Sequence, residues 1–176
     1  MEQLTPVVKK FLLHWGEMGA RWGVNRTVAQ VHALLFIWPR PLNAEEIARL
    51  LGVARSNVST SLRELQNWGI VRVVHVMGDR RDHFESMKDV WDLFRRVLDE
   101  RKRREIDPTL ALLRECVAEA GRAGNAEKHS RQKLSELLDF FVTTTSWYEQ
   151  VRRLSTGAVA RFVAGKGGLR KMLGMS

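Results

Sequence analysis

The sequence predicts a mainly α-helical protein with one small β-hairpin. Apolar residues recur at the spacing of a helical stripe along most of the 176 residues. This period is interrupted by the run "IVRVVHV" (70–76), whose β-branched residues are typical of a strand. The polar segment "MGDRRDH" and the short run "FES" come next, as the turn and the return strand of a hairpin would.

Four helices are expected before the hairpin. The first two span about 5–20 and 26–37, and the motif "WPRP" ends the second because proline cannot continue a helix. The third starts with a capping box, in which Asn43 is the N-cap and Glu46 follows three residues later. The fourth spans about 55–68 and is followed by glycine.

After the hairpin the helical period returns, from about residue 87. Asp107 followed by Pro108 resembles an N-cap and the first residue of a further helix. A long helix is expected over about 126–154, and a short helix in the tail beyond it. The basic run "RKRR" (101–104) lies between acidic residues, which favours a solvated helix end over a nucleic-acid patch.

This order of elements predicts a winged helix-turn-helix with additional dimerisation helices. We expect an N-terminal dimerisation helix in 1–25 and the winged helix-turn-helix in 26–86. A C-terminal helical region for dimerisation and effector binding is expected in 87–176. The apolar surplus on the first and last long helices indicates a homodimer, because one compact winged helix has little room to bury it.

The helix over 55–68 carries an unusual polar face. Ser, Thr and Asn are weak helix formers, yet they gather there with arginine. Such side chains can reach base edges in a major groove, which makes this the expected recognition helix. The wing (70–86) is expected on the DNA backbone or the minor groove. The predicted DNA-binding residues are Arg55, Ser56, Asn57, Ser59, Thr60, Arg63, Asn67, Arg80 and Arg81.

Charge agrees with a polyanionic partner. The net charge is +9, from 29 Lys and Arg against 20 Asp and Glu. Double-stranded DNA is therefore the expected partner, although a soluble protein can also be basic without binding a polyanion.

At the wing tip, Asp79 is expected to orient an arginine through a charge-assisted hydrogen bond. The lack of a leader or a long apolar run predicts a cytoplasmic protein without a membrane partner.

The block "SNVSTSLRELQNWG" with "GDRRD" and "ERKRREI" resembles the GbsR branch of the MarR-type transcriptional regulators, over about 19–113. The resemblance implies a dimeric winged-helix regulator, here expected to be a repressor. It also implies osmoprotectant control, with a choline-like effector. The effector site stays unknown from the sequence.

Other functions are less well supported by the residues. No phosphate-binding glycine loop, nucleophile–base pair or metal-ligand spacing is visible, so the sequence predicts neither an enzyme, a cofactor nor a metal site. The six Trp and Cys116 are expected in the core rather than in an aromatic cage or a redox switch. The alternative is a winged-helix protein-interaction or architectural module without a specific operator.

Overall fold

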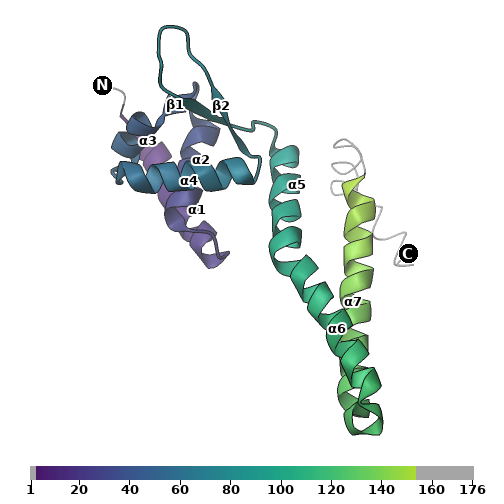
Figure 1. Ribbon diagram of the computed structural model, residues 1–176. Coiled ribbons are helices and arrows are strands. Elements are labelled where there is room, and N and C mark those ends of the chain that lie inside the picture. The colour runs from purple at the N-terminus through teal and green to yellow at the C-terminus, as the bar shows by residue number, and fades with distance from the viewer. Residues whose placement is uncertain (1–2, 154–176) are drawn as a thin grey trace, which may run out of the picture. The chain divides into compact units, whose positions relative to one another are not determined.

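The computed structural model describes residues 3–153, which form helices and one small sheet (Figure 1). The chain divides into two compact units, Met1–Arg96 and Val97–Ser176. The expected helix in the tail lies outside the described residues. Within 3–153, no helix is both long enough and apolar enough to cross a membrane.

The first unit starts with two closely packed helices, α1 (Pro6–Arg21) and α2 (Arg26–Ile37). Gly19 is buried in α1, and a Cβ there would lie 2.6 Å from the Cβ of Ala29 on α2. A larger residue at this position would therefore push the two helices apart. The apolar face of α2 supplies much of the core, through Val31, Leu34 and Leu35 among other residues.

The helix-turn-helix follows as α3 (Ala44–Leu51) and α4 (Arg55–Asn67). The capping box predicted at Asn43 and Glu46 is confirmed, with both reciprocal hydrogen bonds at 3.0 Å. Gly52 ends α3 in the left-handed conformation, at φ 66°, which glycine adopts without steric cost. Ile47 of α3 and the α4 residues Val58, Leu62 and Leu65 are buried, so each helix is held by one apolar face.

The wing is part of a three-stranded antiparallel sheet with the order β1-β3-β2. β2 (Val71–Val74) pairs with β3 (His83–Ser86) as the sequence predicts, and the segment 75–82 joins them. The third strand, β1 (Leu42–Asn43), pairs with β3 and was not predicted. Lys88, just after β3, donates hydrogen bonds from Nζ to three carbonyls at the end of α2, at 3.0–3.2 Å.

The second unit is a run of helices. α5 (Val90–Arg101) begins in the first unit and continues through a π-helical turn, η1 (Lys102–Ile106), into α6 (Asp107–Arg122). A short 3₁₀ turn, η2 (Gly124–Glu127), leads to α7 (Lys128–Arg152), which packs along α6. Leu110, Leu113 and Ala120 are buried on α6.

The prediction that Asp107 is an N-cap is wrong. Ile106, in a helical conformation, precedes α6, and Asp107 already belongs to the helix. Its N–H donates to the carbonyl of Lys102 in a π-type bond, and its carboxylate accepts from Lys102 Nζ at 2.8 Å. The chain therefore passes from α5 to α6 without a break.

The basic run 101–104 is paired rather than free. Arg101 bonds to Glu105 at 3.2 Å, and Arg103 bonds to Glu100 at 2.7 Å. Arg104 lies 3.5 Å from the same Glu100 carboxylate. The run therefore lies within a continuous helical passage and not at the expected helix end, and its residues are ion-paired.

The expectation that the tryptophans are core residues is wrong for Trp22 and Trp147, which are both 58% exposed. The other four are half-buried, and so is Cys116. Trp22 is the C-cap residue of α1 and lies beyond the last turn of that helix, whereas Trp147 lies on a side of α7 that the described residues leave uncovered.

Candidate nucleic-acid interface

The polar face of α4 lies on the surface of the first unit. Its buried side carries Val58, Ser61, Leu62 and Leu65, and the Ser61 hydroxyl donates to the Asn57 carbonyl at 2.8 Å. The predicted contact residues of α4 are on the other side. Ser59 is half-buried, and the others are exposed: Arg55, Ser56, Asn57, Thr60, Arg63 and Asn67.

The start of α4 is bound to α3 by an ion pair. Arg55 donates from Nε to Oε1 of Glu45 at 2.7 Å, and the two side chains are 65% and 47% exposed. The pKa of Glu45 is lowered, first by a hydrogen bond with its own backbone N–H and then by Arg55. Ala54, the N-cap of α4, makes no side-chain capping bond. Glu45 was not among the residues predicted to contact DNA.

The wing tip holds an arginine in a fixed geometry, as the sequence predicts. Arg81 donates from Nε to Asp79 at 2.9 and 3.1 Å and from its Nη2 at 2.5 Å. Its backbone N–H donates to the same carboxylate at 3.0 Å. These bonds to Arg81 hold the pKa of Asp79 well below its usual range. Gly78, at φ 83°, makes the preceding turn possible, and Arg80 is exposed.

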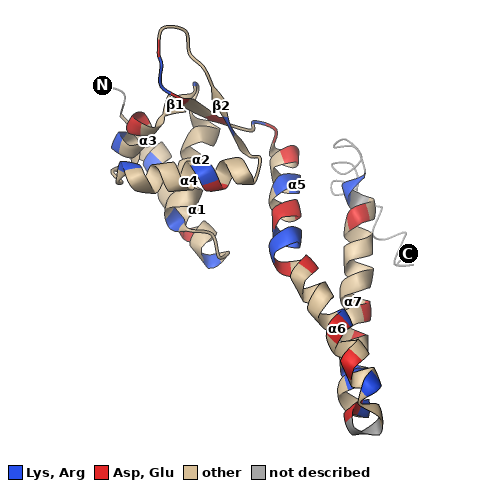
Figure 2. Cartoon of the chain, in the orientation of Figure 1, with Lys and Arg blue, Asp and Glu red and all other residues tan. Residues whose placement is uncertain are grey.

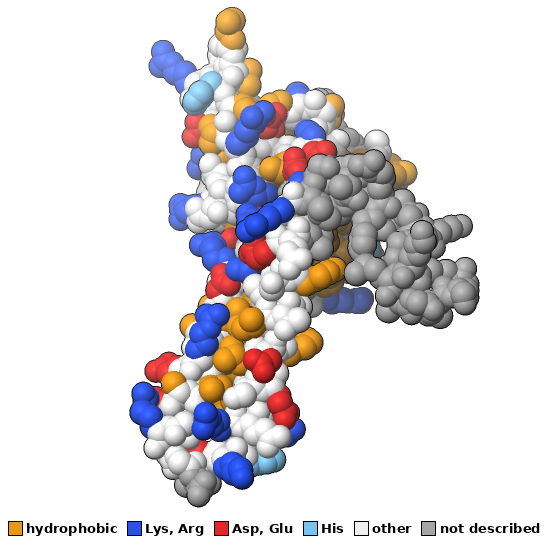
Figure 3. Space-filling view, turned by 90° about the vertical axis from the view of Figure 1, so that its right-hand side faces the viewer, with side chains coloured by type: hydrophobic (Ala, Val, Ile, Leu, Met, Phe, Trp, Pro, Cys, Tyr) orange, Lys and Arg blue, Asp and Glu red, His pale blue; other side chains and the backbone are white. Residues whose placement is uncertain are grey.

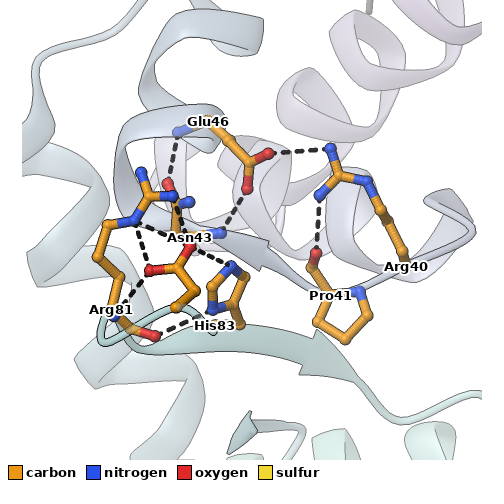
Figure 4. A network of polar contacts seen from close by, with 7 residues as sticks. Arg40, Pro41, Asn43, Glu46, Arg81 and His83 are labelled. Carbon is orange, nitrogen blue, oxygen red and sulfur yellow. Dashed lines mark hydrogen bonds and ion pairs between the residues drawn. The ribbon is translucent and has the colours of Figure 1, made fainter. Parts of the chain in front are cut away.

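Two groups of polar contacts lie beside each other where the wing tip approaches the start of α3 (Figure 4). His83 is buried beside β1, where its Nε2 lies 3.5 Å from Asp79 and its Nδ1 lies 3.0 Å from the Arg81 carbonyl. Next to it in the sheet, Asn43 belongs to the capping box with Glu46. Glu46 in turn accepts from Arg40 at 2.9 Å. The two groups of side chains meet where Asn43 of β1 pairs with His83 of β3 in the sheet.

A groove of about 330 Å³ lies between α4 and the wing. It brings together Arg55, Ser59 and Arg63 of the recognition helix with Arg81 of the wing. It does not include Ser56, Asn57, Thr60, Asn67 or Arg80. The residues that line it are Ala44, Glu45, Arg55, Ser59, Leu62, Arg63, Gln66, Arg81, Asp82 and Phe84. Three guanidinium groups around one groove suit a phosphate chain.

Three polar residues of this groove were not predicted from the sequence, namely Glu45, Gln66 and Asp82. Gln66 lies three residues after Arg63, and its helical angle falls inside the same polar stripe. The periodicity that identified Arg63 could have identified it too. Glu45 and Asp82 carry no comparable signal, because only the folded chain brings them to α4. In 3–153 no group of His, Cys, Asp or Glu could hold a metal ion.

These features define a winged helix-turn-helix protein. Residues 22–82 match the model of the MarR family, which covers the helix-turn-helix and most of the wing. Residues 22–82 thus resemble the winged helix-turn-helix of MarR-type proteins, and this resemblance supports a transcriptional regulator. This confirms the predicted fold class.

Among curated proteins, the chain is similar to the HTH-type transcriptional repressor GbsR of Bacillus subtilis (strain 168). The two are 19% identical over 149 residues, which cover 81% of this chain and 82% of the relative. The resemblance to the GbsR branch is thereby confirmed. A crystal structure described as that of a transcriptional regulator superposes with a TM-score of 0.60 and 22% identity. That match covers 90% of this chain and 99% of the other, and it supports the fold.

Proposed function

We propose that this protein is a sequence-specific DNA-binding repressor that acts as a homodimer. In this proposal α4 enters the major groove, and the wing contacts the backbone or the adjacent minor groove. A two-fold axis would place the two recognition helices on half-sites about one turn of DNA apart, roughly 34–36 Å. The operator would then be an inverted repeat.

The observation that carries this proposal is the groove between α4 and the wing. One sugar–phosphate strand of the DNA separates a major groove from the adjacent minor groove. If α4 enters the major groove and the wing contacts the minor groove, that strand has to pass between them. Arg55, Arg63 and Arg81 line the space where that strand would lie. Figure 2 shows basic residues on α4 and along the wing, with acidic residues among them. The net charge of +9 would attract DNA over a longer range.

A homodimer is supported by apolar side chains on the helices outside the helix-turn-helix. Figure 3 shows apolar groups, interrupted by charged ones, on the surface of the α6–α7 hairpin. The exposed residues there are Leu112, Leu137, Phe140, Val142 and Trp147, and those on and just after α1 are Val7, Leu13 and Trp22. An apolar surface of this kind is typical of a protein interface. We assign it to a second copy of this chain.

Repression is proposed because the Bacillus subtilis relative is named a transcriptional repressor. A dimer bound over a promoter would block access to it. A choline-like effector is proposed from the resemblance to the GbsR branch. The six tryptophans give a fluorescence signal for testing choline and glycine betaine.

In vitro selection from random duplexes tests the central claim. Enrichment of one inverted repeat, protected in a footprint and lost in the Arg63→Ala variant, supports a specific operator. If the protein enriches no sequence, or binds no duplex above background, the proposal is wrong. The winged-helix protein-interaction module then becomes the better account.

A further inference from the structure

Glu45 lies in the groove that we propose for the DNA backbone, where a negative charge opposes phosphate. It is the second residue of α3, and its carboxylate holds Arg55 by one bond of 2.7 Å. Nearly half of its side chain is exposed. Arg81 is close enough for its charge to act on this carboxylate, although it bonds to Asp79. Glu45 therefore lies among the cations that the proposed function assigns to DNA.

We infer that Glu45 is an internal competitor for DNA: its carboxylate occupies Arg55 and opposes the phosphate that the groove would otherwise bind. This inference rests on the proposed function. The Glu45 carboxylate lowers the affinity for every duplex below the value that the three arginines alone would give. It also makes the salt dependence of binding shallower. Because a phosphate contact carries no sequence information, operator and random DNA should be affected alike.

The geometry distinguishes this ion pair from the one at the wing tip. Asp79 is mostly shielded and accepts from both the side chain and the backbone of Arg81, so its charge is used within the turn. Glu45 accepts from Arg55 through Oε1, and both side chains remain open to solvent. A ligand therefore has to replace only one bond to separate Glu45 from Arg55, whereas Asp79 holds Arg81 by several bonds.

The test is a salt titration of binding, by fluorescence anisotropy, on the selected operator and on a scrambled duplex. Glu45→Gln keeps the side-chain size and removes one charge per protomer. It should tighten binding to both duplexes by about three- to tenfold. The slope of log K against log salt should steepen by about one per protomer, because Arg55 then displaces a counterion.

Glu17→Gln is the matched control. Glu17 is also an exposed glutamate paired with an arginine, Arg26, at 3.6 Å, but it lies on α1 and does not line the groove. Its removal changes the net charge equally. Exposed charges beyond about 10 Å are screened at 0.1 M salt, so the control should shift affinity by less than about twofold.

Two arginine variants complete the cycle. Arg55→Ala alone should bind more weakly than the wild type, because Glu45 is left unpaired and facing phosphate. Glu45→Gln with Arg55→Ala removes the whole pair and should return affinity and slope close to wild-type values. Thermal melting checks that every variant is folded; these side chains are exposed, so no core contact is lost.

The outcomes separate the two proposals. A wild-type protein that binds no duplex overturns the proposed function and this inference together. A wild-type protein that binds DNA, with Glu45→Gln equal to the Glu17→Gln control, overturns this inference alone. Weaker binding by Glu45→Gln also overturns it: loss on both duplexes would make Glu45 a positioning residue for Arg55, and loss on the operator alone would make it a base reader. Binding by the double variant that is as tight as that of Glu45→Gln alone overturns the assigned mechanism.

Discussion

Asp79 and Arg81 form a closed pair at the wing tip, in which one carboxylate binds both the guanidinium and the backbone N–H of the same arginine. The pair is local, because only one residue separates its members. His83 flanks it from β3, at 3.5 Å from the Asp79 carboxylate. The orientation of Arg81 is thus fixed before any ligand arrives, and a preorganised group loses less conformational freedom on binding.

Replacing Asp79 by Asn should weaken DNA binding, although the change makes the protein more positive. The loss follows because an amide cannot hold the guanidinium by two charge-assisted bonds. The measurement is affinity for operator and scrambled duplexes at one salt concentration, with Glu17→Gln, outside the groove, as the control for charge. Tighter binding by Asp79→Asn would show that its charge matters more than the orientation of Arg81.

Replacing Arg81 by Ala should weaken binding to operator and scrambled DNA to a similar degree. The wing contact is expected at the backbone or minor groove, so the slope of log K against log salt should flatten by about one per protomer. Arg80→Ala gives a comparison, since Arg80 is exposed but does not line the groove. An unchanged slope in both variants would remove the wing from the DNA surface.

Replacing Arg63 by Ala should lower affinity for the operator more than for scrambled DNA. Arg63 lies on the exposed face of α4 and lines the groove. Loss of a bidentate contact with guanine would cost about 1–3 kcal/mol of discrimination. Selection with the variant should also relax the preference at one base of each half-site. An equal loss on both duplexes would assign Arg63 to phosphate instead.

The helices and the hairpin were predictable because their signals are local. Apolar periodicity places each helix, and the capping box at Asn43 places the start of α3. β1 was missed because it has two residues and forms only by pairing with β3. The continuous passage from α5 to α6 was missed because the Asp107-Pro108 signal for a helix start was overridden by a π turn and by Lys102.

The candidate site was predictable only in part, for the same reason. A single helix face reveals Arg63 and its neighbours, and a short turn reveals Asp79 with Arg81. The pairing of Glu45 with Arg55 joins different helices, ten residues apart. No periodicity relates those two positions, so their contact emerges only when α3 packs against α4.

Replacing Phe140 by Glu should weaken the proposed homodimer. Phe140 is 62% exposed on α7, and a charge at an apolar interface would be desolvated without a partner. Light scattering across micromolar concentrations should show a dimer for the wild type and a larger monomer fraction for the variant. Thr143→Glu, an exposed polar position on the same helix, is the control. A wild-type monomer at these concentrations would remove the dimer from the proposal.

Acidification should destabilise the first unit through His32, which lies in the core on α2. Its side chain is buried, and its Nε2 has no hydrogen-bond partner among the described residues. Burial lowers the pKa of His32 to about 4 from an ordinary value of 6.5. Between these two pH values His32 is protonated in the unfolded chain but stays neutral in the folded chain. The contribution of neutral His32 to the free energy of unfolding is therefore fully present above about pH 6.5 and is lost as the pH falls toward 4.

His32→Leu isolates this contribution. The wild type should lose up to about 3 kcal/mol of unfolding free energy over that window through His32. Carboxylates such as Glu46, whose pKa is lowered by its bonds to Arg40 and Asn43 against the opposing effect of burial, lose stability in acid in both proteins. The difference between wild type and His32→Leu therefore reports the histidine. Urea unfolding at pH 7 and pH 4.5 measures it, with exposed His14→Gln as the control. Parallel pH profiles for the wild type and His32→Leu would show that the core admits the charged imidazole, and the assigned burial effect would be wrong.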